Sequence, residues 1–292
     1  MPHIGKDANA HMAPLIRIGV VAPGTRIDRD LAERLKAFAA DSFLDRAPEI
    51  VVHPQCFLSA GHFAGDDEAR TRAFVDYAND PTLDAIWFAR GGYGASRIAE
   101  AALAQLNDVA RAKTYLGYSD NGVILGGLYA RGFVNVAHGP IPIDLTRGGG
   151  EGAVRRALAW LIDRAPESVE LGVMFDGRSA AFNITVLQSM LGTSLEPNLS
   201  GHVLMLEDVG EYLYRLDRAL FQITSSANIR SVKGIKLGRV SEAPENDKPF
   251  GASEEEMIRY WCAKASIPYL GRADIGHDVE NKVVPFGATP RG

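Results

Sequence analysis

The chain has 292 residues, enough for two modest domains, and its apolar and charged fractions are those of a globular protein. The formal net charge is −5 without any block of lysine or arginine, which argues against nucleic-acid or anionic-membrane binding. Cys56 and Cys262 are far apart and form neither a disulfide framework nor a metal-ligand pair, so we expect a reducing compartment, the cytoplasm. No apolar run approaches the length of a membrane span, and residues 1–14 lack the apolar core of a signal peptide.

Strand and helix patterns alternate along the first half of the chain. We expect helices that begin near Asp28 and Asp66 and a third from Ile98 to Leu106. The expected strands are apolar throughout, which favours a parallel sheet covered on both faces. These strands span residues 15–22, 50–52, 84–89, 114–116 and 133–138.

The second half is more mixed and follows a glycine-rich stretch, 147–152, that indicates a flexible hinge. We expect a helix over 154–162, then a hairpin in which a strand over 169–175 turns at Asp176-Gly177 into 179–182. Further helices are expected over 184–191 and 213–223 and from the capping box at Ser253, with strands over 203–206 and 232–237. We therefore divide the chain into an N-terminal α/β domain (14–146), a linker and helix (147–168) and a C-terminal domain (169–292).

Residues 114–122 have the pattern of a nucleophile elbow. A buried strand ends at Gly117, one hydroxyl is presented at Ser119, and a helical pattern begins at Val123. Such a turn exposes the serine oxygen, and the helix N-terminus behind it offers N–H groups to a developing oxyanion. The match is imperfect because the second glycine of G-x-S-x-G falls one place late, at Gly122. Serine is also a common helix cap, so Ser119 has a structural alternative.

A catalytic serine needs an imidazole base and a group that orients it. Two of the seven histidines, His138 and His277, each follow an apolar segment, and each could equally be an ordinary loop residue. Glu207 ends a buried strand, where a carboxylate is either an exposed strand terminus or a functional group. The segments that begin at Arg90, Ser119 and His138 all lie at the carboxyl ends of expected strands and so share one crevice. Spacing alone does not choose among these candidates.

Several stretches spread over the chain together resemble the LD-carboxypeptidase family, which includes murein tetrapeptide carboxypeptidases and the related microcin C self-immunity peptidases. The pair Arg90-Gly91-Gly92-Tyr93-Gly94 and Gly117-Tyr118-Ser119-Asp120 is the most specific. The other matching stretches are Val20-Val21-Ala22-Pro23-Gly24, Phe63-Ala64-Gly65-Asp66-Asp67-Glu68-Ala69-Arg70, His138-Gly139-Pro140, Leu206-Glu207-Asp208-Val209-Gly210-Glu211 and Gly276-His277.

The resemblance implies a fold and a triad. The N-terminal domain would be a flavodoxin-like or amidotransferase-like parallel-sheet sandwich that carries the nucleophile Ser119. A smaller, β-rich C-terminal domain would bring Glu207 as the orienting carboxylate and His277 as the base. The resemblance thus selects Glu207 over Asp208 and Glu211, and His277 over His138.

The resemblance also implies how the substrate is held. Backbone N–H groups of Gly92 and Asp120 would form the oxyanion hole. Arg90 is a candidate for binding the terminal carboxylate of a peptide, with a salt bridge or loop anchor as its alternative role. No metal or other cofactor is expected, and the protein would be a homodimer. The implied reaction removes a terminal D-Ala from an L-centre diamino acid of a murein tetrapeptide.

Two departures from the family pattern place the substrate in question. Asn121-Gly122 stands where the elbow usually continues with an apolar residue and threonine, and Ala181-Phe182-Asn183 replaces the usual Gly-Gly-Asn. We expect these side chains to reshape the cleft. The alternatives are an immunity-type peptidase that cleaves peptidyl or aminoacyl nucleotides and a binding protein that lacks turnover. The absence of G-x-G-x-x-G and Walker A patterns after the first strand argues against a nucleotide- or flavin-binding domain.

Overall fold

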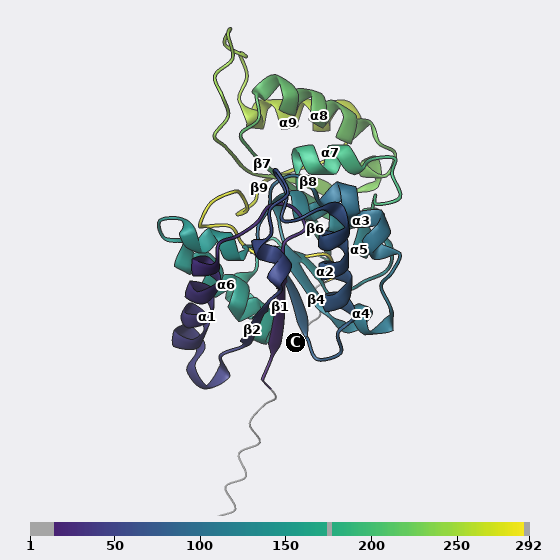
Figure 1. Ribbon diagram of the computed structural model, residues 1–292. Coiled ribbons are helices and arrows are strands. Elements are labelled where there is room, and N and C mark those ends of the chain that lie inside the picture. Colours follow the sequence, from purple (N-terminus) through teal and green to yellow (C-terminus); the bar gives the residue numbers. More distant parts are fainter. Residues whose placement is uncertain (1–14, 174–176, 289–292) are drawn as a thin grey trace, which may run out of the picture.

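The structure is a computed structural model that describes residues 15–173 and 177–288. Two sheets, one above the other in Figure 1, dominate it. The first has six strands in the order β10-β5-β4-β3-β1-β2, and the second has five in the order β11-β6-β7-β8-β9. Every neighbouring pair is parallel except β10 with β5 and β11 with β6, which are antiparallel.

The first sheet has the alternating strand–helix order that the sequence predicts. Its helices cover both faces, with α1 and α6 on one side and α2 to α5 on the other (Figure 1). Its strands and helices are β1 (Arg17–Val21), α1 (Arg29–Phe43), β2 (Glu49–Val52), α2 (Asp67–Asn79), β3 (Ala85–Phe88), α3 (Ala95–Leu103), α4 (Asp108–Ala112), β4 (Thr114–Gly117), α5 (Gly122–Ala130), β5 (Val136–His138) and α6 (Gly150–Asp163).

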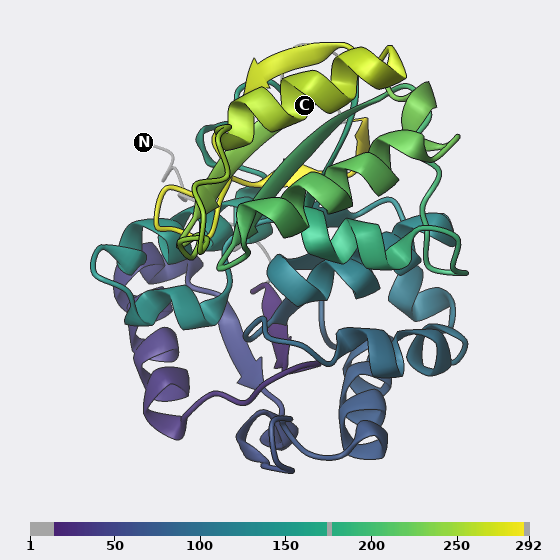
Figure 2. The same cartoon turned by 90° about the horizontal axis from the view of Figure 1, so that it is seen from above.

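The second sheet is also built from strands linked by helices, so this part of the chain is α/β as well. Helices α7, α8 and α9 lie over one of its faces, as the view from above in Figure 2 shows. Its strands and helices are β6 (Arg178–Asn183), α7 (Ile184–Met190), β7 (His202–Val209), α8 (Leu213–Ser225), β8 (Gly234–Ser241), α9 (Glu254–Ala265) and β9 (Tyr269–Arg272).

The end of the chain joins the two sheets. After β9 the chain passes through His277 and returns to the first sheet as β10 (Val284–Pro285), then pairs with β6 of the second sheet as β11 (Gly287–Ala288). One apolar core runs through both parts and includes Phe88 and Val123 from the first and Phe182 and Leu206 from the second. The division at residues 147–168 therefore stays a prediction, and the last strands cross it.

The predicted strand over 169–175 and its hairpin are wrong. Residues 169–173 form no strand and make only an isolated bridge from Val169 to Val283, while Asp176 of the predicted turn lies outside the described residues. Strand β6 pairs with β7 and β11 in place of the predicted hairpin. The glycine-rich stretch 147–152 forms a turn that leads into α6 at Gly150, where a Cβ would lie 1.8 Å from the Asp144 carbonyl oxygen. Its flexibility as a hinge stays a prediction.

Candidate active site

The predicted elbow is present at the carboxyl end of β4. Residues Ser119–Asn121 form one 3-10 turn between β4 and α5. Ser119 has a φ of 60°, in the left-handed region that serine rarely adopts. Strained backbone of this kind concentrates at functional sites. The sharp turn of a nucleophile elbow imposes such strain on its serine.

The loop after β3 packs directly against the elbow. A Cβ on Gly91 would lie 2.8 Å from both Cβ and Oγ of Ser119. Thr25 Oγ1 donates a 2.8 Å hydrogen bond to the Gly91 carbonyl, and Gly92 follows with a φ of +88°. A side chain at Gly91 would thus collide with Ser119, and one at Gly92 would collide with Thr25, so this loop needs both glycines. The role of Gly92 in an oxyanion hole stays a prediction.

Asp120 ties the elbow to the same loop through its side chain. Its Oδ2 accepts a 2.7 Å hydrogen bond from the backbone N–H of Ala95, at the start of α3. Burial raises the pKa of this carboxyl group, although hydrogen bonds from Ala95 and Gly94 act in the opposite direction. The carboxylate thus caps α3.

The two departures from the family pattern are buried in the protein. The Asn121 amide donates to the carbonyls of Arg90 (3.2 Å) and Tyr118 (3.1 Å) and so braces the elbow. Phe182 is 1% exposed and packs on Phe286, with ring centroids 5.0 Å apart. A Cβ on Gly122 would lie 3.5 Å from the Phe182 ring. The large Phe182 thus fills the space beside a glycine, and the expectation that these residues reshape the cleft stays a prediction.

Glu207 and His277 form a buried pair at the carboxyl end of β7. Glu207 Oε2 lies 2.5 Å from His277 Nδ1, and the two side chains are 0% and 8% exposed. The strands leave room for this pair at Gly238 of β8, where a Cβ would lie 2.7 Å from the Ile275 carbonyl and 3.0 Å from the Glu207 Cβ. His277 Nε2 is buried and has no hydrogen-bond partner among the described residues.

The charges around His277 favour its protonated form. Burial lowers the pKa of His277, but the charge of Glu207 and its hydrogen bond outweigh burial and raise the pKa above its ordinary value. Asp208 acts in the same direction, while Arg147 opposes it. Because a carboxylate at Nδ1 selects the tautomer with the lone pair on Nε2, His277 has the arrangement of a general base.

His138, the other histidine candidate, has a different environment. Its Nε2 lies 3.2 Å from Oδ1 of Asn281, which also accepts a hydrogen bond from the Gly276 N–H. Burial lowers the pKa of His138 to about 4, so the ring is neutral near pH 7. His138 thus supports the loop that carries His277.

Side chains that were not predicted as site residues also contact His277. The ring of Tyr118, the residue before Ser119, packs against the imidazole with centroids 4.8 Å apart. The Tyr118 hydroxyl donates a 2.9 Å hydrogen bond to Asp144, and Arg147 donates to the His277 carbonyl. Tyr118 lies within a motif quoted above, but no sequence pattern pointed to Asp144 or Arg147. The structure therefore brings the elbow and His277 together through Tyr118.

Asp208 is oriented away from this pair. Its carboxylate accepts hydrogen bonds from the Asn183 amide (3.0 Å), from the N–H and hydroxyl of Thr185 (3.0 and 2.9 Å) and from the Val209 N–H (2.7 Å). Burial raises the pKa of Asp208 to about 6. Asp208 therefore fixes the start of α7 at the end of β7.

Arg90 is exposed, and its guanidinium lies 3.3 Å from the Arg26 carbonyl oxygen.

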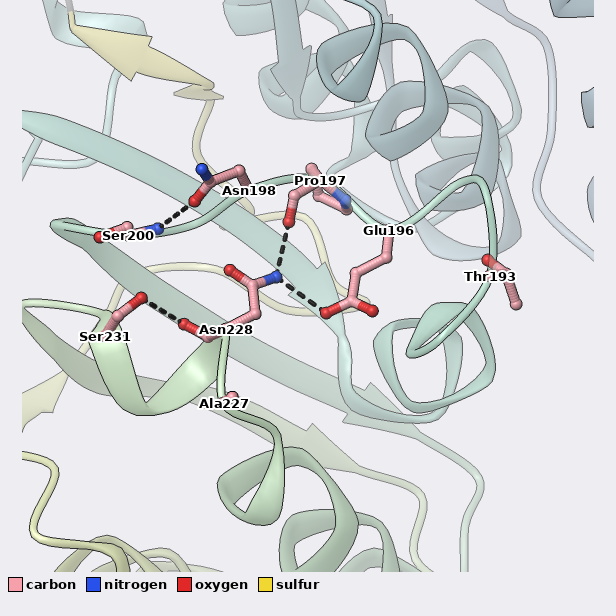
Figure 3. A pocket seen from close by; sticks show the side chains of 8 residues that line it. All are labelled: Thr193, Glu196, Pro197, Asn198, Ser200, Ala227, Asn228 and Ser231. Atoms are coloured by element: carbon pink, nitrogen blue, oxygen red, sulfur yellow. Dashed lines mark hydrogen bonds between the residues drawn. The ribbon is translucent and has the colours of Figure 1, made fainter.

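A depression of about 460 Å³ lies near the carboxyl end of β7 and is lined by Thr185, Gln188, Glu211, Tyr214, Arg215 and Arg218. Another, of about 590 Å³, lies at the opposite end of β7 (Figure 3). In this second depression the Asn228 amide donates to Glu196 and to the Pro197 carbonyl. Because it lies before the start of β7, it is remote from Glu207 near the end of that strand.

Neither a metal cluster nor a membrane-spanning helix is found within residues 15–173 and 177–288. No group of three or more His, Cys, Asp or Glu side chains in these ranges is arranged to hold a metal ion. None of the helices there is long and apolar enough to cross a bilayer.

Comparison with known proteins gives the family. The sequence model of the LD-carboxypeptidase N-terminal domain matches residues 18–139, and that of the C-terminal domain matches residues 176–291. The murein tetrapeptide carboxypeptidase of Pseudomonas aeruginosa is 28% identical over 293 residues, which cover 94% of this chain and 92% of that protein.

Solved structures agree with this match. The muramoyltetrapeptide carboxypeptidase of Oxalobacter formigenes superposes with a TM-score of 0.76 at 26% identity, covering 92% of this chain and 93% of that one. MccF, in complex with glutamyl sulfamoyl guanosine, has the same fold, with a TM-score of 0.75 at 18% identity over 94% of this chain and 92% of its own. The chain therefore belongs to the LD-carboxypeptidase family of serine-type hydrolases.

Proposed function

We propose that this protein is a serine carboxypeptidase that removes the terminal D-Ala from a murein tetrapeptide, with Ser119, Glu207 and His277 as its triad. The observation that carries the proposal is the 2.5 Å contact between Glu207 and His277 Nδ1, which leaves Nε2 of the buried ring without a partner among the described residues. Nε2 is the atom that would accept the proton of Ser119, and Tyr118 connects the elbow to this ring.

The proposed reaction has two steps. His277 Nε2 takes the proton from Ser119 as Oγ attacks the carbonyl carbon before the D-Ala, and the same proton then goes to the leaving amine. Water hydrolyses the acyl-enzyme with His277 again as base, which releases the tripeptide and restores Ser119. Glu207 holds the imidazole and stabilises its cationic form throughout. The backbone N–H groups of Gly92 and Asp120 are our candidates for the oxyanion hole.

Two arguments support a peptide with a free carboxylate as the substrate. The relative from Pseudomonas aeruginosa, matched over 92% of its length, is a murein tetrapeptide carboxypeptidase. In addition, the exposed Arg90 lies on the loop that packs against the elbow. We propose that Arg90 contacts the terminal carboxylate. Replacing Arg90 with Ala would then raise KM for the tetrapeptide more than it lowers kcat, as expected when ground-state binding is removed.

The second candidate function is cleavage of peptidyl or aminoacyl nucleotides. It is favoured by the fold shared with MccF, a protein whose structure holds an aminoacyl sulfamoyl nucleoside, although at 18% identity that likeness concerns the fold alone. Comparing hydrolysis of the tetrapeptide with that of an aminoacyl sulfamoyl adenylate separates the two substrates. A binding protein without turnover would cleave neither.

We also propose that the enzyme is a cytoplasmic homodimer. The two cysteines are free and buried, which suits a reducing compartment, and the dimer follows from the family resemblance. Cell fractionation tests the compartment, and sedimentation equilibrium tests the dimer.

The nucleophile can be tested without knowing the substrate. A fluorophosphonate forms a covalent bond with an activated serine, and peptide mass spectrometry locates the modified residue. We expect the label on Ser119 in the wild type and none in Ser119→Ala. Loss of labelling in His277→Gln would show that the imidazole activates the serine, whereas undiminished labelling of Ser119→Ala would refute the assignment.

A further inference from the structure

Glu207 alone does not fix the imidazole of His277. One hydrogen bond at Nδ1 leaves the ring free to tilt about that contact, and His277 lies on the connection between β9 and β10. Ser119, by contrast, is carried by β4 of the first sheet. The reaction requires these two segments to keep one geometry within a fraction of an ångström.

A buried group on the first sheet's side supplies the missing contacts. Asp144, which is 0% exposed, accepts hydrogen bonds from the Tyr118 hydroxyl (2.9 Å) and the Ile141 N–H (2.9 Å), and its Oδ1 lies 3.2 Å from Arg147 Nε. Tyr118 packs on the ring of His277, and Arg147 donates to the His277 carbonyl. The ring and the backbone of His277 are thus both held by partners of one carboxylate.

We propose that Tyr118, Asp144 and Arg147 form a positioning network that holds the imidazole of His277 against the elbow of Ser119. The proposal rests on the proposed function and adds residues outside its triad. Tyr118 is central because it is covalently adjacent to Ser119 and at the same time contacts the base. The side chains of all three residues act through His277, so they are positioning residues and not catalytic ones.

The network also sets the electrostatic environment of the base. Charged or titratable groups surround His277 on several elements. They are Glu207 and Asp208 from β7, Tyr118 from the elbow, Asp144 and Arg147 from the turn before α6, His138 from β5, and Asp278 with its partner Arg239 of β8. Asp144 and Arg147 carry opposite charges. Neutralising each one should therefore move the pKa of His277 in opposite directions, which a purely structural role does not predict.

The test compares single-atom or charge changes with a matched control. Tyr118→Phe removes one buried hydroxyl, and Tyr115→Phe in β4, three residues earlier, removes another, which donates to the Ala110 carbonyl at 2.8 Å. We expect Tyr118→Phe to lower kcat for D-Ala release about tenfold with little change in KM, and Tyr115→Phe to leave kcat within about twofold. Equal losses in the two variants would overturn the proposal.

A second readout does not depend on activity. In full-length protein labelled at histidine, NMR titration follows His277, assigned by comparison with His277→Gln. We expect Asp144→Asn to lower the pKa of His277 by about one unit, Arg147→Met to raise it, and Arg147→Lys to return it toward the wild-type value. Shifts of the same sign, or none, would refute the network. If the wild type released no D-Ala, the proposed substrate would fail while this titration still tested the network.

Discussion

Gly91 packs so closely on Ser119 that a Cβ added to it would lie 2.8 Å from both Cβ and Oγ of the serine. The loop after β3 therefore touches the proposed nucleophile itself. Because the φ of Gly91 is not in the left-handed region, an alanine there adds a methyl group without adding backbone strain.

We predict that Gly91→Ala displaces the Ser119 side chain and lowers kcat/KM at least about 100-fold, since small misplacements at a reacting centre have effects of this size. Gly148→Ala is the control, because a Cβ at Gly148 meets nothing within 4 Å. Steady-state kinetics and the melting temperature should be measured for both. A Gly91→Ala enzyme with wild-type kcat/KM would show that Ser119 does not need its present position.

The pH profile should report the pair of Glu207 and His277. His277 must be neutral to act as a base, and its pKa is raised by Glu207 despite burial. Activity is therefore lost as pH falls, and the acid limb of kcat/KM should have its midpoint above 6.5, the ordinary histidine value. A midpoint near the pKa of about 4 that burial gives His138 would instead identify His138 as the base.

Removing the charge of Glu207 should act on both rate and pH dependence. Glu207→Gln takes away the anion that raises the pKa of His277, so the acid limb should move to lower pH. We expect kcat to fall on the order of 10²- to 10⁴-fold, because the amide no longer fixes the tautomer. Glu211→Gln, which changes a carboxylate paired with Arg215 at 3.5 Å, should retain the wild-type profile.

Phe182 should matter for stability more than for substrate choice. Its buried ring fills the space between Gly122 of α5 and Phe286 next to β11. Phe182→Ala should therefore lower the free energy of unfolding by about 3–5 kcal/mol, as measured by urea denaturation. KM for the tetrapeptide should stay within about threefold of wild type. A large change in KM with little loss of stability would place Phe182 in the binding site after all.

His138 should make the fold sensitive to acid. Its pKa is about 4 in the folded state and about 6.5 when unfolded, so the unfolded chain binds more protons between these values and stability falls as pH is lowered through this window. In His138→Asn this loss is absent. The free energy of unfolding of the wild type should therefore fall by about 2–3 kcal/mol more than that of the variant between pH 7.5 and pH 4.5. A difference independent of pH would mean that His138 titrates normally.

The sequence predicts β1 to β5 of the first sheet well because each is a short apolar run with a helix after it. It does not predict β10, which returns from the end of the chain. It predicts the second sheet less well. The apolar stretch from Val169 resembles a strand, but its partners are set by the returning segment near Val283, which local patterns do not reveal. The close approach of Gly150 to Asp144 is likewise absent from the local pattern of 147–152.

In the candidate active site, too, contacts between distant segments could not be predicted from local sequence patterns. The elbow of Ser119 can be predicted because strand, turn and helix are consecutive. The choice of Glu207 over Asp208 depends on which face of β7 each side chain occupies, and the resemblance supplied it where spacing could not. Asp144 and Arg147 could not be predicted, since their contacts with Tyr118 and His277 join segments up to 130 positions apart.

The most direct test of the account measures D-Ala release from L-Ala-γ-D-Glu-meso-diaminopimelate-D-Ala by the wild type, Ser119→Ala and His277→Gln under identical conditions. We predict release by the wild type, with turnover lowered by several orders of magnitude in both variants while their folds stay intact by circular dichroism. Wild-type rates in Ser119→Ala would contradict the mechanism, and no release by any of the three proteins would contradict the substrate.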